Sequence, residues 1–299
     1  MKAGSQGAGS QSDPAEIKTS RKGGSRSDPL VNGSSQHDKS EHGDLVGKLY
    51  IVGIGPGDLK SMTGQACDAI ASSSHVIGNE TYLRSIGPLL NGKTVIRSAM
   101  GQEVDRAQEC VALARDHVVS IVSGGDPGVY GMASIVLEVI DRAGTDLPVE
   151  IIPGVTAATA AASRVGAPLS GDFAVISLSD LLTPYEVIER RLDLAFSMGV
   201  PVVLYNPKSR GRPHHFMAAV AIAERHLPPD TPVAMVRNAC REGEEVFITT
   251  LGCAGSEEAR VDMHSTVIIG GDGSRLWRRN DETIKGIITP RGYHRKYLY

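Results

Sequence analysis

From residue 48 onward, two hydrophobic patterns alternate along the chain. Short runs rich in Val and Ile, such as "KLYIVG" at 48–53 and "VVSIV" at 118–122, predict buried strands. Segments with apolar residues three or four positions apart, such as 102–116 and 130–144, predict amphipathic helices. Thr63 is placed to cap a helix over 63–73, and Gly144 to end the helix over 130–144. Regular alternation of strand and helix predicts an α/β domain with a mainly parallel sheet.

A second α/β unit is predicted to begin near Asp172. Its helices are expected at 184–199 and 215–226, and its strands at 172–180, 200–207, 231–239, 244–252 and 264–271. The later β runs follow one another with few helices between them, which predicts antiparallel strands in this half. We place the boundary in "GAPLSG", which gives an N-terminal domain at 48–168 and a C-terminal domain at 169–273. The segment 274–299 is polar and basic, with weak signals of order, and is predicted to be a tail.

The segment before residue 48 is rich in Gly, Ser and charged residues and has no apolar core. Such a composition buries too little surface to offset the entropy of ordering, so we predict a disordered extension over 1–47. The segment also lacks the apolar region of a secretory signal. The chain has no run of about 18 apolar residues that would cross a membrane. We therefore expect a cytoplasmic protein with no membrane partner.

Composition narrows the classes of partner and cofactor. The 299 residues carry a formal net charge of −3 and only 4% aromatic residues, so neither a basic field nor stacking platforms point to nucleic acid. The four cysteines have no CxxC pair and no Cys/His grouping at metal-ligand spacing. We expect them to be reduced thiols, and we expect no bound metal. They are Cys67, Cys110, Cys240 and Cys253.

The loop "GIGPG" at 53–57 invites a dinucleotide interpretation. Its spacing, G-x-G-x-G, is one residue short of the dinucleotide fingerprint. Pro56 also removes an N–H where a pyrophosphate needs a donor. A nicotinamide or flavin site is therefore disfavoured.

The loop "SGGDPGVYG" at 123–131 contains no Lys or Arg, so it lacks the counter-charge of a phosphate cradle. Glycines with a single carboxylate suit a neutral or cationic ligand. The alternative is a tight turn in which Asp126 caps the following helix. The segment "IIPGVTAATAAA" at 151–162 has a similar form, and its small residues permit close approach of a ligand or close packing of a helix on the sheet. Loops at the carboxyl ends of parallel strands are where α/β proteins bind ligands, which favours a site.

Seven motifs, taken in order, resemble the tetrapyrrole (corrin/porphyrin) methylase family. They are "YIVGIGPGD", "VSGGDPGVYGMA", "IIPGVTAATAAASRVGAPL", "SLSDLLTP", "VLYNP", "PVAMVRNACREGE" and "ITPRGYHRKY", and together they extend from about Lys48 to Tyr297. A finer signature is similar to the branch that methylates precorrin-3B at C17 with ring contraction, in cobalamin biosynthesis. It consists of "GDFAVISLSDLLTPYEVIERRL", "LYNPKSRGRP" and "ITPRGY". Gly124 departs from the family pattern, since relatives often have serine there.

The resemblance implies two α/β domains with the active site in the cleft between them, a homodimer, a tetrapyrrole substrate, and S-adenosylmethionine as methyl donor. Carried over by motif, the donor-binding residues are Gly125, Asp126, Val129, Tyr130, Thr156, Ala157, Tyr205, Asn206, Ala234 and Thr266. The "GIGPG" loop is implied to face the tetrapyrrole through Gly55, Pro56 and Gly57.

Methyl transfer from a sulfonium to an enamine-like carbon mainly requires placement and exclusion of water. Ring contraction additionally requires a base, for which Asp58 is the candidate; the alternative is that Asp58 caps or turns its loop. The substrate carries several carboxylates, so cations are expected at the rim of the cleft, with Lys208, Arg210 and Arg212 in "NPKSRGRP" as the best cluster. Arg84, Arg97 and Arg106 are further candidates.

Three other functions remain open at the level of sequence. The chain is alternatively another precorrin C-methyltransferase such as the C11 enzyme, a nucleotide-binding α/β protein without chemistry, or a Rossmann oxidoreductase.

Overall fold

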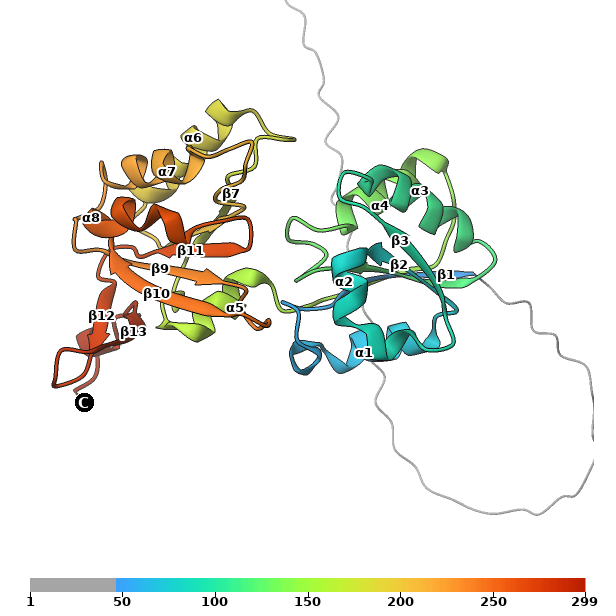
Figure 1. Ribbon diagram of the computed structural model, residues 1–299, viewed down its shortest axis with the longest axis horizontal. Helices are drawn as coiled ribbons and strands as arrows, with labels where there is room; N and C mark the ends of the chain where they lie inside the picture. Colours follow the sequence, from blue (N-terminus) through green and yellow to red (C-terminus); the bar gives the residue numbers. More distant parts are fainter. Residues whose placement is uncertain (1–46, 299) are drawn as a thin grey trace, which may run out of the picture. The chain divides into compact units, whose positions relative to one another are not determined.

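A computed structural model describes residues 47–298 (Figure 1). The predicted extension at 1–47 lies outside this part of the chain, except for its last residue. Within the described residues the strands form two five-stranded sheets and one three-stranded sheet.

The first sheet belongs to the N-terminal domain and has the strand order β3-β2-β4-β1-β5, with every pair parallel. This confirms the predicted parallel sheet. Its strands are β1 (Lys48–Gly53), β2 (His75–Asn79), β3 (Thr94–Ser98), β4 (Val118–Ser123) and β5 (Val149–Ile152). The segments between them form η1 (Leu59–Ser61), α1 (Gly64–Ser72), α2 (Glu80–Ser85), η2 (Gly87–Leu90), α3 (Glu103–Leu113) and α4 (Ala133–Ala143).

Alternate residues of each strand in this sheet face opposite layers of helices. On β1, Leu49 and Ile51 belong to the core formed with α3 and α4, whereas Val52 packs with α1 and α2. Figure 1 shows these two helix pairs on opposite sides of the sheet. The chain therefore leaves the neighbouring strands β1 and β4 toward opposite faces, which opens a crevice at their carboxyl ends.

The predicted ends of two helices are confirmed. The Thr63 hydroxyl accepts a hydrogen bond from the Ala66 N–H at 3.1 Å, at the start of α1. Gly144 ends α4 in the left-handed conformation, with φ of 57°.

The second sheet belongs to the C-terminal domain and has the order β10-β9-β11-β8-β7. Only β7 and β8 pair in parallel, and the other pairs are antiparallel, as predicted. The strands are β7 (Ala174–Ser177), β8 (Val202–Tyr205), β9 (Pro232–Arg237), β10 (Glu245–Thr250) and β11 (Ser265–Ile269). One face packs on α6 (Tyr185–Ser197), α7 (His215–Ala223) and α8 (Leu251–Ala254), with η3 (Gly255–Arg260) following α8.

The other face of the second sheet is covered by α5 (Ala157–Arg164). Ala158, Ala161 and Ala162 of α5 share a core with Val203 and Ile268 of the sheet. Small side chains on the helix permit this close approach. The chain thus passes from one sheet to the other at 153–156, earlier than the boundary predicted in "GAPLSG".

Two strands lie in the segment predicted to be a tail. β12 (Arg275–Arg278) and β13 (Ile284–Ile288) pair antiparallel, and β13 pairs in parallel with β6 (Gly166–Ala167). Ile287 is fully buried in the core that contains α5. Three of the four residues of β12 are exposed, so its sequence lacks the apolar run that predicts a buried strand. The last helical turn described is η4 (Tyr293–Arg295).

None of the helices described between residues 47 and 298 has the length and apolar composition needed to cross a bilayer.

Candidate functional site

The loops that follow β1, β4 and β5 are joined at the crevice of the first sheet. Gly55 and Gly125 exchange two backbone hydrogen bonds, of 3.1 and 2.8 Å. The carboxylate of Asp126 accepts from the Gly128 N–H at 2.8 Å and from the Gly154 N–H at 3.0 Å. Asp126 therefore links the β4 loop to the β5 loop. It does not cap α4, whose N-cap residue is Met132.

The glycines of these loops permit close packing of one loop on another. A Cβ on Gly154 would overlap the carbonyl oxygen of Gly125. A Cβ on Gly124 would lie 2.5 Å from the ring of Tyr82. Gly125 itself has φ of +69°, a conformation that glycine adopts without strain.

A cavity of about 410 Å³ lies at these loops and is lined by residues of both domains. Three of its residues, Tyr130, Asn206 and Asn238, have φ between 51° and 53°. Non-glycine residues in this region are strained and tend to cluster at functional sites. The full lining is Pro56, Asn79, Thr81, Tyr82, Met100, Gly124, Gly125, Val129, Tyr130, Thr156, Ala157, Tyr205, Asn206, Asn238, Ala239, Arg241, Met263, His264, Ser265 and Thr266.

Two tyrosines of this cavity make hydrogen bonds between segments distant in sequence. The Tyr205 hydroxyl accepts from the Ala158 N–H at 2.6 Å and shares a hydrogen bond with the Thr156 hydroxyl at 2.6 Å. Burial raises the pKa of Tyr205, so its hydroxyl stays protonated near neutral pH. The Tyr130 hydroxyl accepts from the Ser177 N–H at 3.1 Å and donates to the Val175 carbonyl at 3.2 Å. These contacts attach the loop after β4 to the edge of the second sheet.

Eight of the ten residues predicted to bind the donor line this cavity. They are Gly125, Val129, Tyr130, Thr156, Ala157, Tyr205, Asn206 and Thr266. Asp126 does not line it, because its carboxylate is turned to the backbone of the loops. Ala234 does not line it either: its side chain is fully buried between the second sheet and α5.

Six lining residues of the C-terminal domain were not among those predicted to bind a ligand: Asn238, Ala239, Arg241, Met263, His264 and Ser265. The first three lie within the "PVAMVRNACREGE" motif, so the motif itself was the available signal. Asn79 ends β2, Thr81 and Tyr82 lie in the first turn of α2, and Met100 lies in the loop after β3. No sequence motif distinguished these four residues.

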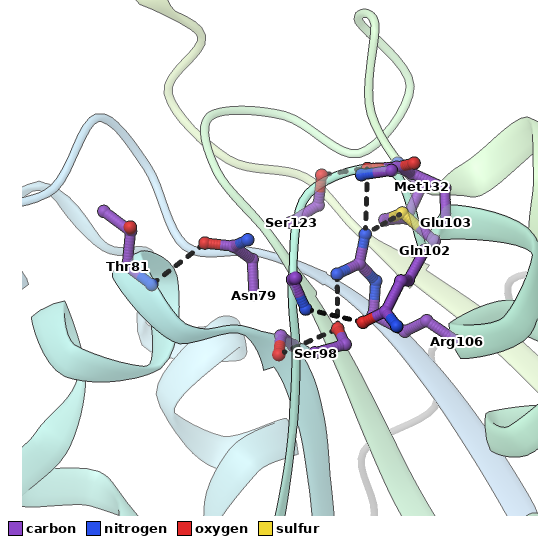
Figure 2. A network of polar contacts seen from close by, with 11 residues as sticks. Asn79, Thr81, Ser98, Gln102, Glu103, Arg106, Ser123 and Met132 are labelled. Carbon is purple, nitrogen blue, oxygen red and sulfur yellow. Dashed lines mark hydrogen bonds and ion pairs between the residues drawn. The ribbon is translucent and has the colours of Figure 1, made fainter.

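A network of polar contacts joins the ends of β2, β3 and β4 (Figure 2). Arg106 is only 4% exposed; it donates to the Ser98 hydroxyl at 2.5 Å and pairs with Glu103 at 3.4 Å. The Ser123 hydroxyl at the end of β4 accepts from the Met132 N–H at 3.3 Å, and Met132 in turn contacts Arg106. Arg106 is therefore a buried structural residue, not the rim cation that the sequence suggested.

A second, smaller cavity of about 260 Å³ adjoins the β1 loop. Gly55 and Gly57 line it, while Pro56 lines the larger cavity. Its lining is Ile54, Gly55, Gly57, Thr81, Tyr82, Arg84, Ser85, Arg241 and Glu242. The three predicted substrate residues of the β1 loop are thus all at a cavity.

The predicted cation cluster "NPKSRGRP" lines neither cavity. Lys208 pairs with Glu258 at 2.8 Å, and Arg212 pairs with Asp180 at 3.8 Å. Arg210 is exposed. Two of the three charges are therefore already compensated within the C-terminal domain.

Asp58 caps the short helix η1. Its carboxylate accepts from the Lys60 N–H at 2.8 Å, and the residue lines neither cavity. This geometry agrees with the capping alternative, and the catalytic role of Asp58 stays a prediction.

The sequence of this chain matches a known protein family. The model of the family "Tetrapyrrole (Corrin/Porphyrin) Methylases" matches residues 48–254. A probable cobalt-factor III C(17)-methyltransferase of Salmonella typhimurium is 42% identical over 246 residues, which are 82% of this chain and 99% of that protein. A precorrin-3B C(17)-methyltransferase of a Sinorhizobium species is 41% identical, over 83% of this chain and 98% of that protein. The chain spans only about half the length of two other similar proteins, from Archaeoglobus fulgidus and Priestia megaterium.

Two solved structures have a similar fold. The crystal structure of the methyltransferase CobJ superposes on this structure with a TM-score of 0.75 at 30% identity. The match covers 82% of this chain and 100% of the CobJ chain. A uroporphyrin-III C-methyltransferase of Thermus thermophilus, complexed with S-adenosylhomocysteine, has a TM-score of 0.60 at 24% identity, over 75% of this chain and 97% of that one. The two-domain α/β arrangement predicted from the sequence is that of these enzymes.

Proposed function

Because the chain belongs to the tetrapyrrole (corrin/porphyrin) methylase family, we propose that it transfers a methyl group from S-adenosylmethionine to C17 of precorrin-3B or its cobalt analogue. The transfer is accompanied by ring contraction and belongs to cobalamin biosynthesis. Two relatives that the chain matches over nearly their whole length are named for methylation at C17, which supports this position over C11. The proposal rests on one structural observation above all: eight residues expected at the donor, from separate loops, strands and a helix start, line one cavity.

The lining of the larger cavity fits a cationic, nucleoside-like donor. Its volume of about 410 Å³ lies in the range of about 300–1,000 Å³ typical of small-molecule sites. The lining offers tyrosine faces and neutral polar groups, such as the amides of Asn79 and Asn206, and Arg241 is its only Lys or Arg. A sulfonium near aromatic faces and oxygen acceptors is favoured electrostatically. Gly125, Thr156, Ala157 and Tyr205 are the residues that would hold it.

The bound donor supplies a methyl group on a positively charged sulfur. The residues of this chain contribute by placement: Tyr205 fixes the start of α5 through the Ala158 N–H, and Tyr130 fixes the β4 loop to β7. Fixed loops reduce the freedom that two reactants lose on the way to the transition state. Asp58 remains the candidate base for ring contraction, because a carboxylate with one backbone donor still has free acceptor positions.

The proposal includes a homodimer in the cytoplasm that has no nucleic-acid or membrane partner. Light scattering after size-exclusion chromatography tests the oligomeric state. A monomeric mass at working concentration would remove the dimer from the proposal.

The decisive test is incubation with S-adenosylmethionine and either precorrin-3B or cobalt-factor III, followed by mass spectrometry and NMR. We expect one additional methyl group at C17 and a contracted ring. A methyl group at C11, or none with either substrate, would overturn the proposal. Titration calorimetry with S-adenosylhomocysteine and with NADH separates it from the oxidoreductase alternative, since only the first compound is expected to bind.

A further inference from the structure

We propose that Arg241 binds a carboxylate of the tetrapyrrole at the smaller cavity, with Arg84 as the second cation there. The inference deepens the proposed function, on which it rests, because it names how this chain recognises the acidic side chains of its substrate. From the sequence, the carboxylates of the substrate were expected to bind at "NPKSRGRP" instead.

Arg241 lies in the segment after β9 and reaches the β1 loop of the other domain. Its Nε donates to the carbonyl oxygen of Pro56, and the residue lines both cavities. No hydrogen bond or ion pair of its two Nη atoms is found among residues 47–298. The guanidinium group of Arg241 is half-buried, and its two Nη groups can donate hydrogen bonds to both oxygens of a carboxylate.

The β1 loop is shaped to receive this side chain. A Cβ built on Gly57 would lie 2.7 Å from Cγ and 3.0 Å from Cδ of Arg241, so the arginine lies directly against the glycine backbone. Gly57 has φ of +138°, which other residues rarely adopt. The glycine thus leaves space for Arg241 beside the loop that is predicted to face the tetrapyrrole.

The charges around the smaller cavity favour an anion. Its lining contains two arginines and one acid, Glu242, which leaves one net positive charge. Arg84 is largely exposed, and its contact with Glu80 is long, at 3.7 Å. By contrast, Lys208 is occupied by Glu258 of its own domain at 2.8 Å, and Arg212 lines neither cavity. An incoming carboxylate therefore finds the two Nη groups of Arg241 without a partner among residues 47–298, and Arg84 beside the same cavity, where it shares Glu80 with Arg97.

The test is Arg241→Gln, measured by calorimetry with two separate probes. The first probe is uroporphyrin, a tetrapyrrole polycarboxylate that requires no turnover, and the second is S-adenosylhomocysteine. We expect the Kd for uroporphyrin to rise at least ~10-fold, as when one partner of a charge pair is removed. The Kd for S-adenosylhomocysteine should change much less, because Arg241 is one of twenty residues that line the larger cavity. The Kd of Arg241→Lys for uroporphyrin should lie between those of the unmodified protein and of Arg241→Gln, because an ammonium keeps the charge but lacks the planar fork.

Arg191→Gln is the matched control, since Arg191 is an exposed arginine on α6 that lines neither cavity. It should bind both probes as the unmodified protein does. Unchanged uroporphyrin binding by Arg241→Gln would overturn the inference. Equal weakening of both probes would also overturn it, because Arg241 would then only hold the domains together. If the unmodified protein binds uroporphyrin but methylates neither corrin precursor, the proposed function fails while the carboxylate site stands.

Discussion

Asp126 is the carboxylate that connects the loop after β4 to the loop after β5. One oxygen accepts from the Gly128 N–H within its own loop, and the other accepts from the Gly154 N–H across the crevice. Both oxygens are therefore engaged with backbone, next to Gly125, which lines the larger cavity. Its influence on donor binding acts through the position of these loops.

We expect Asp126→Asn to weaken donor binding and to destabilise the fold. An amide presents one oxygen and one NH2 group, so one of the two backbone N–H groups loses its acceptor and faces a donor. Losing one such hydrogen bond costs about 0.5–1.5 kcal/mol, because one contact is exposed and the other is only partly buried. Denaturant unfolding should show a loss of this size, and calorimetry should show a higher Kd for S-adenosylhomocysteine.

Asp172→Asn is the control, because Asp172 is exposed and has no hydrogen bond or ion pair among the described residues. It should leave both measurements unchanged. An Asp126→Asn protein with the original stability and donor affinity would show that neither backbone contact contributes.

At the scale of elements, glycines at the carboxyl ends of β1, β4 and β5 pack directly against one another. Gly53 and Gly154 lie so close that a Cβ on either would contact the other's backbone. Close approach of these loops holds the Gly55–Gly125 hydrogen bonds in register. The glycines that border the crevice therefore act on loop packing, and Gly124 and Gly125 also line the larger cavity.

Gly154→Ala is expected to lower the free energy of unfolding by about 1–3 kcal/mol, the usual cost of inserting an extra carbon into a well-packed site. The new methyl group would force the β5 loop away from Gly125. Thermal or denaturant unfolding measures the loss.

Gly64→Ala provides the comparison, since Gly64 is the first residue of α1 and a Cβ there meets nothing within 4 Å. That variant should be as stable as the parent or slightly more stable. Equal stability of the two variants would contradict the loop-packing argument.

At the scale of the whole molecule, the larger cavity takes its lining from both domains. Tyr130 and Thr156 come from loops of the first sheet, and Tyr205 and Thr266 come from strands of the second. A ligand that contacts both sets is bound only when the domains are folded and in place. Binding of the donor product should therefore stabilise the molecule as a unit.

We expect S-adenosylhomocysteine at about 100 times its Kd to raise the free energy of unfolding by about 2.7 kcal/mol. The denaturant midpoint should shift equally when unfolding is followed by circular dichroism and by the fluorescence of the single tryptophan, Trp277 on β12. A shift seen by only one signal would mean that the ligand is held by one domain alone.

The sequence by itself determined the strands of the two five-stranded sheets and most of the helices that cover them. Val and Ile runs specified the strands, Thr63 and Gly144 specified helix ends, and the motifs located the loops that line the cavity. These features are local, because strand burial, capping and left-handed turns depend on residues close together in the chain.

Only the tertiary structure decided which polar groups are free to bind a ligand. Asp126 and Lys208 carry charges that suit a ligand. In the fold, however, Asp126 binds the backbone of Gly154, 28 residues away, and Lys208 binds Glu258, 50 residues away. Arg241 was inconspicuous in its motif, yet the fold brings it to Pro56, 185 residues away, and its two Nη atoms have no partner in the described part of the chain. The order of β12 and β13 likewise depends on pairing with β6, more than a hundred residues earlier. The availability of a charge, and the order of a polar strand, depend on distant partners that a local pattern does not contain.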